Sequence, residues 1–320
     1  MVGWVENEAV LCPSPQIGNV QMSQFKPLLA ATLTTDEFPN VQYPVMGSPK
    51  LDGIRVLILN GIPVTRSLKP VRNKYVQSIL AKPEFEGLDG EILVGDPSDP
   101  MAFRDTTSGV MAEAGESDFT YYVFDDVRGT DIGFLQRYRA LEVRVAQLNH
   151  PRIKLVKHEM IGQSEELVCY EADQLELGYE GVMIRSLDGP YKYGRSTLKE
   201  GTLLKVKQFR EDEATIIGFV ERMKNCNEQT RDLLGNAERS SHKENMMPEG
   251  TLGAFRVLCD LFHDEFTVGS GLNDAERQKI WDNQSEYLGK TLKFKHMTYG
   301  GYNQPRFPIY KGIRDKEDMS

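Results

Sequence analysis

A single lysine stands in a distinctive setting near the start of the chain. In the stretch SPKLDGIR, Lys50 lies two residues before Asp52 and five before Arg55. A lysine beside a turn is commonly a solvated cation, so this pattern alone leaves two interpretations open. A neutral lysine is also a nucleophile, and neighbouring cations lower the pKa of a lysine by disfavouring its charged form.

Two lysines further along the chain are candidates for the neighbouring cations that would lower the pKa of Lys50. In LLKVKQF, Lys205 and Lys207 alternate with apolar residues, and a strand of period two places both on one face. Two cations on the inner face of a strand are costly unless an anion lies beside them, which favours a phosphate site. We expect Lys205 and Lys207 to help deprotonate Lys50 and to neutralise a phosphoryl group under attack.

Two glutamates next to glycines complete the candidate site. Glu91 follows Asp89-Gly90 at the start of an apolar run, and Glu180 precedes Gly181 in EGVMIR. Either carboxylate alone is better explained by a turn or a salt bridge. Together with the lysines, they offer oxygen ligands for a divalent metal or acceptors for a ribose hydroxyl. The set predicts nucleotidyl transfer through a lysine phosphoramidate.

The elements that position these groups predict an α+β fold. Asn60-Gly61 predicts a hairpin directly after Lys50. Apolar residues at helical spacing predict helices over 134–149 and 164–178. Hairpins mixed with helices favour antiparallel sheets over alternating βαβ units. Strand-like runs cover 90–95, 119–127, 154–160, 181–186 and 203–209.

The chain of 320 residues is long enough for two domains. From about residue 211 the pattern changes to short strands with turn signals, typical of an oligonucleotide-binding (OB) barrel. We therefore expect one domain over residues 1–210 and an OB domain over 211–320. Within the second, 222–250 is too polar and too long for a core loop, so it is either functional or disordered.

Composition limits the class of protein. The net charge of -9 argues against a protein that coats nucleic acid, but 185–210 and 290–314 are locally basic, which suits a polyphosphate partner. The four cysteines lack a CxxC pair, which argues against a zinc site or a disulfide scaffold. Without a signal-like start or a membrane-length apolar run, we expect an intracellular, soluble protein, cytoplasmic or, for a viral protein, in the host cytoplasm or nucleus.

Six motifs in order carry a family resemblance: KLDGIR, TRS, LDGEI, YYVFDD, EGVMIR and LLKVKQ. They resemble the motif series of the covalent nucleotidyltransferases, and the similarity to compact viral ATP-dependent DNA ligases spans about residues 45–318. The resemblance implies a nucleotidyltransferase domain of ATP-grasp-like antiparallel sheets with helices, followed by an OB domain. It also implies that 222–250 is a latch that closes over nicked duplex DNA, with an ordinary surface loop as the alternative.

The resemblance implies a role for each matching residue in binding ATP with Mg²⁺ or Mn²⁺. Lys50 attacks the α-phosphate, Phe124 stacks on adenine, and Asp52 orders the site. Ser48 stands where many cellular ligases carry a glutamate that reads the adenine amino group. The other implied contacts are the ribose or metal at Glu91, the metal at Glu180, the phosphates at Arg195, the α-phosphate at Lys205 and Lys207, and the final motif at Arg306, Arg314 and Asp318.

For DNA, the resemblance implies that Arg55 and Arg66 hold the phosphate and sugar at the nick. It also implies that Phe103 faces the 3′ side of the nick, with burial in the core as the alternative for a lone phenylalanine. The implied activity is sealing of 3′-hydroxyl/5′-phosphate nicks through a lysyl-AMP intermediate, by a monomer without an obligate protein partner. The alternatives are an mRNA-capping guanylyltransferase, an RNA ligase, or a non-catalytic DNA-binding module. Replication, repair and recombination remain equally open as settings.

Overall fold

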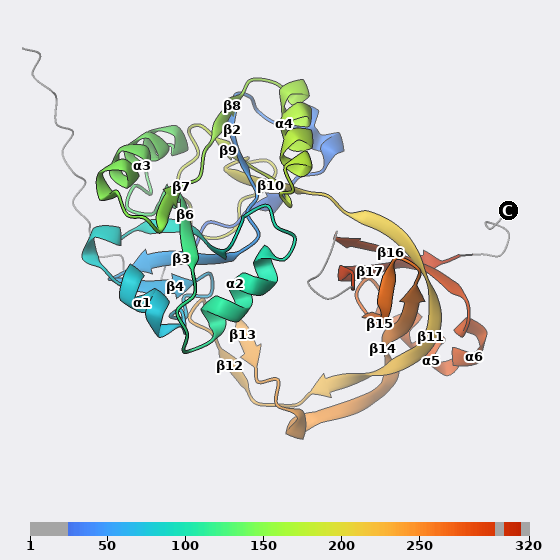
Figure 1. Ribbon diagram of the computed structural model, residues 1–320. Coiled ribbons are helices and arrows are strands. Elements are labelled where there is room, and N and C mark those ends of the chain that lie inside the picture. The colour runs from blue at the N-terminus through green and yellow to red at the C-terminus, as the bar shows by residue number, and fades with distance from the viewer. Residues whose placement is uncertain (1–24, 298–303, 315–320) are drawn as a thin grey trace, which may run out of the picture.

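Three five-stranded sheets organise the chain in the computed structural model, which describes residues 25–297 and 304–314. Two sheets use strands that precede residue 208, and the third uses strands from residue 210 onward. Figure 1 shows the first two sheets and their helices as one body, with the third sheet beside it. The expected α+β first domain and β-rich second domain are confirmed.

The first sheet has the order β4-β3-β5-β6-β7, and all its neighbours are antiparallel except β6 and β7. Asn60 and Gly61 have positive φ angles of 52° and 71° and join β3 to β4 in the predicted hairpin. Helix α2 packs on β5, and α3 packs on β6 and β7. The strands are β3 (Ile54–Leu59), β4 (Ile62–Thr65), β5 (Leu88–Val94), β6 (Phe119–Asp126) and β7 (Ile153–Leu155).

The second sheet has the order β1-β10-β9-β2-β8 and is antiparallel except for β1 beside β10. The single strand predicted over 154–160 is wrong. The chain leaves the first sheet after β7 and enters the second at β8, so both sheets share this short segment. The strands are β1 (Ala31–Thr32), β2 (Val45–Pro49), β8 (Glu159–Ile161), β9 (Gly181–Ser186) and β10 (Leu203–Lys207).

The two predicted helices are confirmed as α3 (Phe134–Leu148) and α4 (Ser164–Glu176). The pattern did not predict α1 (Lys74–Leu80) or α2 (Ala102–Met111). The sequence of α2 contains threonine, serine and glycine, which have low helix propensity, and burial of Thr106 and Val110 offsets this cost. Short 3₁₀ helices are η1 (Thr35–Asn40) and η2 (Pro83–Phe85).

The third sheet has the order β15-β14-β11-β16-β17 around a core that includes Phe255 and Phe294. The first residues of β11 pair with β16, and the rest of β11 pairs with β14. The elements are β11 (Arg210–Asn225), β14 (Met246–Cys259), β15 (Phe262–Val268), α5 (Asp274–Asp282), α6 (Gln284–Tyr287), β16 (Thr291–Met297) and β17 (Arg306–Ile313).

The polar insert forms an arm that reaches back to the first domain. Strands β11 and β14 extend together, and the hairpin of β12 (Gln229–Arg231) and β13 (Ala237–Arg239) lies at their end, before η3 (Lys243–Asn245). Leu234 packs against the apolar cluster that contains Val64 and Leu68. Lys69 Nζ lies 2.8 Å from Glu238 Oε1. Figure 1 shows the elements following a closed path through this contact.

Two further sequence expectations are addressed by the described residues. Among the described residues, no helix is both long enough and apolar enough to cross a membrane. Cys169, Cys226 and Cys259 are free thiols there. Cys12 and Asp318 lie outside the described residues.

Weakening the contact between the arm and the first domain should loosen the arm locally without destabilising the whole protein. Replacing Leu234 with alanine removes about 1 kcal/mol of apolar burial. Hydrogen exchange across 229–239 should therefore quicken by roughly fivefold while the melting temperature stays unchanged. Leu233→Ala is the matched control because Leu233 is 64% exposed. Equal exchange in the two variants would contradict the contact.

Candidate active site

Lys50 follows the last residue of β2, and its backbone position is fixed by the neighbouring strand. Its N–H donates to the carbonyl of Gly181, at 2.8 Å. The turn after it packs tightly, since a Cβ added at Gly53 would lie 2.2 Å from the carbonyl oxygen of Ile92. Only glycine fits there. Lys50 is therefore held at the junction of the two sheets, beside the first residue of β9.

Strand β10 carries the other two lysines along the same wall. Lys205 pairs with Met183 on β9, and Lys207 pairs with Gly181. The intervening Leu204 and Val206 are buried on the opposite face of the sheet, each about 2% exposed. The alternation therefore aims both lysines to one side of the sheet, as the sequence pattern predicts.

A cavity of about 250 Å³ lies against these groups. It gathers nine of the predicted site residues from elements far apart in the sequence. They are Ser48, Lys50, Arg55, Arg66, Glu91, Phe124, Arg195, Lys205 and Lys207.

Glu180 links two of the lysines. Its carboxylate contacts Nζ of both Lys50 and Lys207, and its side chain is only 9% exposed. Burial raises the pKa of Glu180, but the charges of Lys50 and Lys207 outweigh burial and hold the pKa below its usual value. The carboxylate therefore stays ionised between two ammonium groups.

The pKa values of the two lysines on β10 are also lowered, which for a lysine disfavours the charged form. Burial and the charge of Lys50 lower the pKa of Lys207, and burial with the charges of Lys207 and Arg195 lowers the pKa of Lys205. We expected these lysines to act directly on Lys50, whereas Glu180 lies in contact with it. Because Glu180 occupies Nζ of Lys50, this contact must open before Lys50 can attack a substrate.

Glu91 lies on β5 in the wall of the same cavity. Burial raises the pKa of Glu91 to about 7, against the opposing charges of Lys50 and Arg55. Its side chain is therefore poised between a neutral donor and a charged acceptor near neutral pH.

Arg55 is clamped by residues that the sequence patterns did not single out. Its Nε and Nη2 donate to the two oxygens of Asp89, at 2.8 and 2.6 Å, and its Nη1 donates to the carbonyl of Leu28, at 2.6 Å. The Tyr191 hydroxyl also donates to Asp89, at 2.7 Å. Asp89 lies within LDGEI, but the sequence analysis gave no role to Leu28 or Tyr191.

Three predicted residues lie at the border between the domains. Arg306 on β17 forms an ion pair with Asp52 and stacks over Phe103, with Cζ 4.2 Å from the ring centroid. Asp52, Glu180 and Arg306 line a second cavity of about 430 Å³. Glu180 thus stands between this cavity and the lysines of the first one.

The structure places Arg314 away from both cavities. Its Nε lies 2.6 Å from Glu213 Oε1, within the third sheet. Asp318, the remaining member of the final motif, is outside the described residues.

The carboxylates fit a divalent metal only together with a ligand. Among residues 25–297 and 304–314, no cluster of three or more His, Cys, Asp or Glu side chains is arranged to hold a metal ion. Mg²⁺ typically keeps several waters and binds one or two carboxylates plus substrate phosphates. Glu180 and Glu91 supply such a partial set beside a cationic, phosphate-sized wall.

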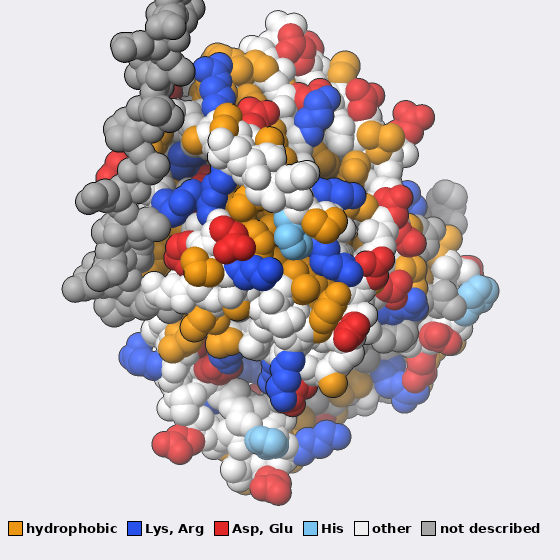
Figure 2. Space-filling view, turned by 60° about the vertical axis from the view of Figure 1, so that its left-hand side comes forward, with side chains coloured by type: hydrophobic (Ala, Val, Ile, Leu, Met, Phe, Trp, Pro, Cys, Tyr) orange, Lys and Arg blue, Asp and Glu red, His pale blue; other side chains and the backbone are white. Residues whose placement is uncertain are grey.

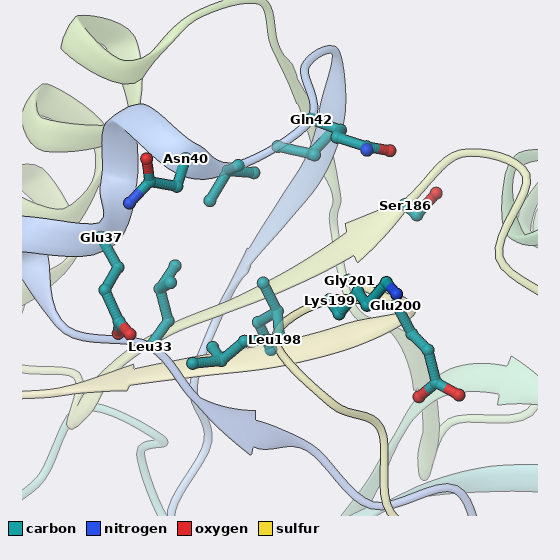
Figure 3. A pocket seen from close by; sticks show the side chains of 12 residues that line it. Leu33, Glu37, Asn40, Gln42, Ser186, Leu198, Lys199, Glu200 and Gly201 are labelled. Atoms are coloured by element: carbon teal, nitrogen blue, oxygen red, sulfur yellow. The ribbon is translucent and has the colours of Figure 1, made fainter.

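Another cavity, of about 380 Å³, is lined by Leu204, on the face of the second sheet opposite Lys205 and Lys207. Figure 3 shows this cavity. Its wall combines leucines with a polar rim that includes Glu37 and Lys199. None of the predicted site residues lines this cavity. Lys199 does line it and is therefore a suitable control for the lysines of the candidate active site.

Comparison with known proteins identifies relatives of both domains. A family model described as "ATP dependent DNA ligase domain" matches residues 27–207, and one described as "DNA ligase OB-like domain" matches residues 245–314. A probable DNA ligase of Kineococcus radiotolerans is 31% identical over 197 residues, which are 57% of this chain and 37% of the relative. A DNA ligase of Haemophilus influenzae is 26% identical over 191 residues, 59% of this chain and 58% of the relative.

Solved structures give matches over more of the chain. The Chlorella virus DNA ligase-adenylate is 36% identical, with a TM-score of 0.51, and the match covers 92% of this chain and all of that one. A Lig E DNA ligase, 20% identical with a TM-score of 0.67, shares the fold over 90% of this chain and 99% of that one. The chain spans 37% and 58% of the length of the two curated relatives above.

The raised pKa of Glu91 predicts a pH-dependent stability. In the unfolded chain Glu91 ionises near pH 4.5, so the folded protein binds an extra proton between that pH and about 7. This contribution is fully present below the window and is lost as pH rises through 7. In metal-free urea titrations from pH 5 to pH 8, wild type should lose about 1 to 3 kcal/mol relative to Glu91→Gln. Glu113→Gln, at an exposed site, is the control, and parallel curves for wild type and Glu91→Gln would refute the assignment.

Proposed function

Because this chain belongs to the ATP-dependent DNA ligase family, we propose that it seals 3′-hydroxyl/5′-phosphate nicks in duplex DNA. The observation that carries the proposal is the placement of Lys50 beside Lys207 and Lys205 in a cavity that also holds Phe124. A nucleophile, two phosphate-binding cations and a ring for base stacking are what lysine adenylation requires.

In the first proposed step, Lys50 Nζ attacks the α-phosphate of ATP. Lys50 first releases a proton to solvent, and the N–P bond then forms as the bond to pyrophosphate breaks. Phosphate oxygens give Lys207 a new partner, which frees it from Glu180 and loosens the contact between Glu180 and Lys50. Lys205 and Arg195 then neutralise charge on the phosphates.

A divalent metal, Mg²⁺ or Mn²⁺, would be held by Glu180, with Glu91 as a second carboxylate or ribose contact. Bound there, it would screen phosphate charge and favour the deprotonated nucleophile. Glu180 suits this role because its two present partners, Lys50 and Lys207, are the groups that the nucleotide engages.

In the remaining steps, the 5′-phosphate at the nick takes AMP from Lys50, and the 3′-hydroxyl then displaces AMP to form the phosphodiester. Arg66 lines the cavity with an exposed side chain, which suits a contact to the nick. Arg55 lines it too, but Asp89 already clamps it, so we assign Arg55 mainly to ordering the site. Arg306 stacks over the ring of Phe103, which is still 37% exposed, so we assign Phe103 to the 3′ side of the nick, as the resemblance implies.

The second domain is proposed to act in adenylation through Arg306. Arg306 forms an ion pair with Asp52, which lies two residues after the nucleophile Lys50. This pair places the guanidinium in position to bind the β- and γ-phosphates that leave as pyrophosphate. Arg314 and Asp318 keep the role implied by resemblance, although Arg314 pairs with Glu213 here.

We propose domain limits of 1–210 and 211–320, with 222–250 as a latch around duplex DNA and one chain as the working unit. The family matches at 27–207 and 245–314 and the arm contact at Glu238 support these limits. On the face in Figure 2, acidic, basic and hydrophobic side chains are interspersed, so that face offers no continuous cationic path for DNA.

Ser48 leaves the adenine amino group without the glutamate that many cellular ligases carry, so selectivity for ATP over GTP requires a direct test. Capping and RNA-ligase activities remain the alternatives. The DNA ligase matches over both domains favour sealing of DNA.

Labelling with ATP tests the first step. With α-labelled ATP, magnesium and no DNA, the wild type should acquire a covalent label that Lys50→Ala loses entirely. Lys199→Ala should label like the wild type, because Lys199 lines the cavity on the other side of the sheet. An unlabelled wild type, a labelled Lys50→Ala variant, or a preference for GTP would overturn the proposal.

If 222–250 is a latch that closes around the duplex, locking it shut should exclude DNA that has no free ends. With Cys12, Cys169 and Cys226 changed to serine, Lys69→Cys and Glu238→Cys can be joined by a short cleavable bis-maleimide. The joined enzyme should seal nicked linear duplexes, which thread through a closed path from their ends, but not nicked circles. Cleaving the linker should restore sealing of circles, and the Lys69→Cys single variant is the control. Equal sealing of both substrates by the joined enzyme would exclude the latch.

A further inference from the structure

We infer that Asn73 is a positioning residue for the sealing step: it fixes the C-terminal end of α2 and thereby holds Phe103 in place for the 3′ side of the nick. The inference rests on the proposed function and adds a residue that none of the six motifs contains. Asn73 lies in the loop between β4 and α1, yet it is 0% exposed. A buried polar side chain must be paired, so its partners indicate its role.

The side-chain amide of Asn73 joins two helices. Its Oδ1 accepts from the N–H of Val76, at 2.9 Å, and so caps the N-terminus of α1. Its Nδ2 donates to the carbonyls of Gly109, Ala112 and Gly115, at 3.2, 3.1 and 3.1 Å. Because the last carbonyls of a helix have no partner within the helix, Asn73 supplies a donor that the C-terminus of α2 needs.

Two neighbouring contacts close the same end of α2. Ser117 Oγ donates to the carbonyl of Gly109, at 2.7 Å, and the N–H of Lys74 donates to the carbonyl of Glu113, at 3.1 Å. A Cβ added at Gly109 would lie 2.6 Å from Ser117 Oγ, so glycine lets the chain after α2 lie directly against the helix. The end of α2 and the loop that follows it are therefore gathered around the amide of Asn73.

Helix α2 depends on such contacts because it has only ten residues, fewer than an isolated helix needs to be stable in water. In its middle, Thr106 Oγ1 accepts from the N–H of Val94 on β5, at 2.8 Å. The anchors at Thr106 and Asn73 together set the position of α2 on the first sheet. Loss of the anchor at Asn73 leaves the helix free to turn about the contact at Thr106.

The opposite end of α2 carries Phe103, whose ring is 37% exposed and lies 4.2 Å from Cζ of Arg306. In the proposed last step, the 3′-oxygen bonds to the 5′-phosphorus, the bond from that phosphorus to the AMP oxygen breaks, and the hydroxyl proton goes to solvent. Misplacing a reacting group by about 1 Å can slow such a step on the order of 100-fold. Among the described residues, those that line the cavity of Lys50 include none from α2, so adenylation should be spared.

The test measures the two steps separately on the same protein. Adenylation is followed by covalent labelling with α-labelled ATP in the absence of DNA. Sealing is followed on a nicked duplex that already carries AMP on its 5′-phosphate, in the absence of ATP. Asn73→Ser keeps a capping oxygen for α1 but loses the amide donors. It should adenylate within about threefold of the wild-type rate and seal about 10- to 100-fold more slowly.

A double-mutant cycle with Phe103→Ala separates positioning from a general loss of stability. Phe103→Ala alone should slow sealing of the adenylated nick to a similar extent. Adding Asn73→Ser should then change the rate by less than about threefold, because the ring that Asn73 positions is already absent. Effects that multiply in the double variant would overturn the inference.

The matched control is Asn273→Ala. Asn273 caps α5 in the second domain by the same type of bond, from the N–H of Glu276 at 2.9 Å. This variant loses a helix cap but should keep the wild-type rates of both steps. An equal loss of adenylation and sealing in Asn73→Ser, or an unchanged sealing rate, would contradict the inference.

Ser117→Ala provides the test if Asn73→Ser does not fold. It removes a single side-chain donor from the carbonyl of Gly109 and should slow sealing about threefold with unchanged adenylation. A wild-type sealing rate in this variant would count against the inference. Failure of the proposed function has a different outcome, which is a wild type that neither takes label from ATP nor seals the adenylated nick.

Discussion

The contact of Glu180 with Lys50 and Lys207 is the interaction on which the rest of the site depends. It joins the turn after β2, the residue before β9 and the end of β10 through one buried carboxylate. Buried charges persist only when they are paired, so this contact keeps two ammonium groups together without a ligand. In the proposed adenylation, a polyphosphate would offer the same cations new partners, and ATP binding would rearrange the site toward attack.

The backbone beside Glu180 requires a glycine at position 181. Gly181 has a φ of 148°, and a Cβ there would lie 2.2 Å from the carbonyl oxygen of Val206. The same glycine accepts the hydrogen bond from the N–H of Lys50. One residue without a side chain thus lets β9 and β10 approach closely enough for Lys207 and Lys50 to meet the same carboxylate. The second domain adds to this centre through the ion pair of Arg306 with Asp52.

Several of these features were predictable from sequence because they are local. The alternation in LLKVKQF placed Lys205 and Lys207 on one face, Asn60-Gly61 gave the hairpin, and helical spacing gave α3 and α4. Motif order brought Glu180 near the lysines, although not its contact with both. The remainder depends on long-range contacts that no local pattern encodes. The clamp of Arg55 by Asp89 joins segments far apart, and β7 and β8 belong to different sheets although three residues separate them.

Sealing of a labelled nicked duplex, with ATP, GTP or NAD supplied in parallel, tests the account most directly. The account predicts sealed product with ATP and divalent metal, and none with GTP or NAD. Sealing with NAD or GTP in place of ATP, or a protein that binds the nick without sealing it under any of the three, would contradict it.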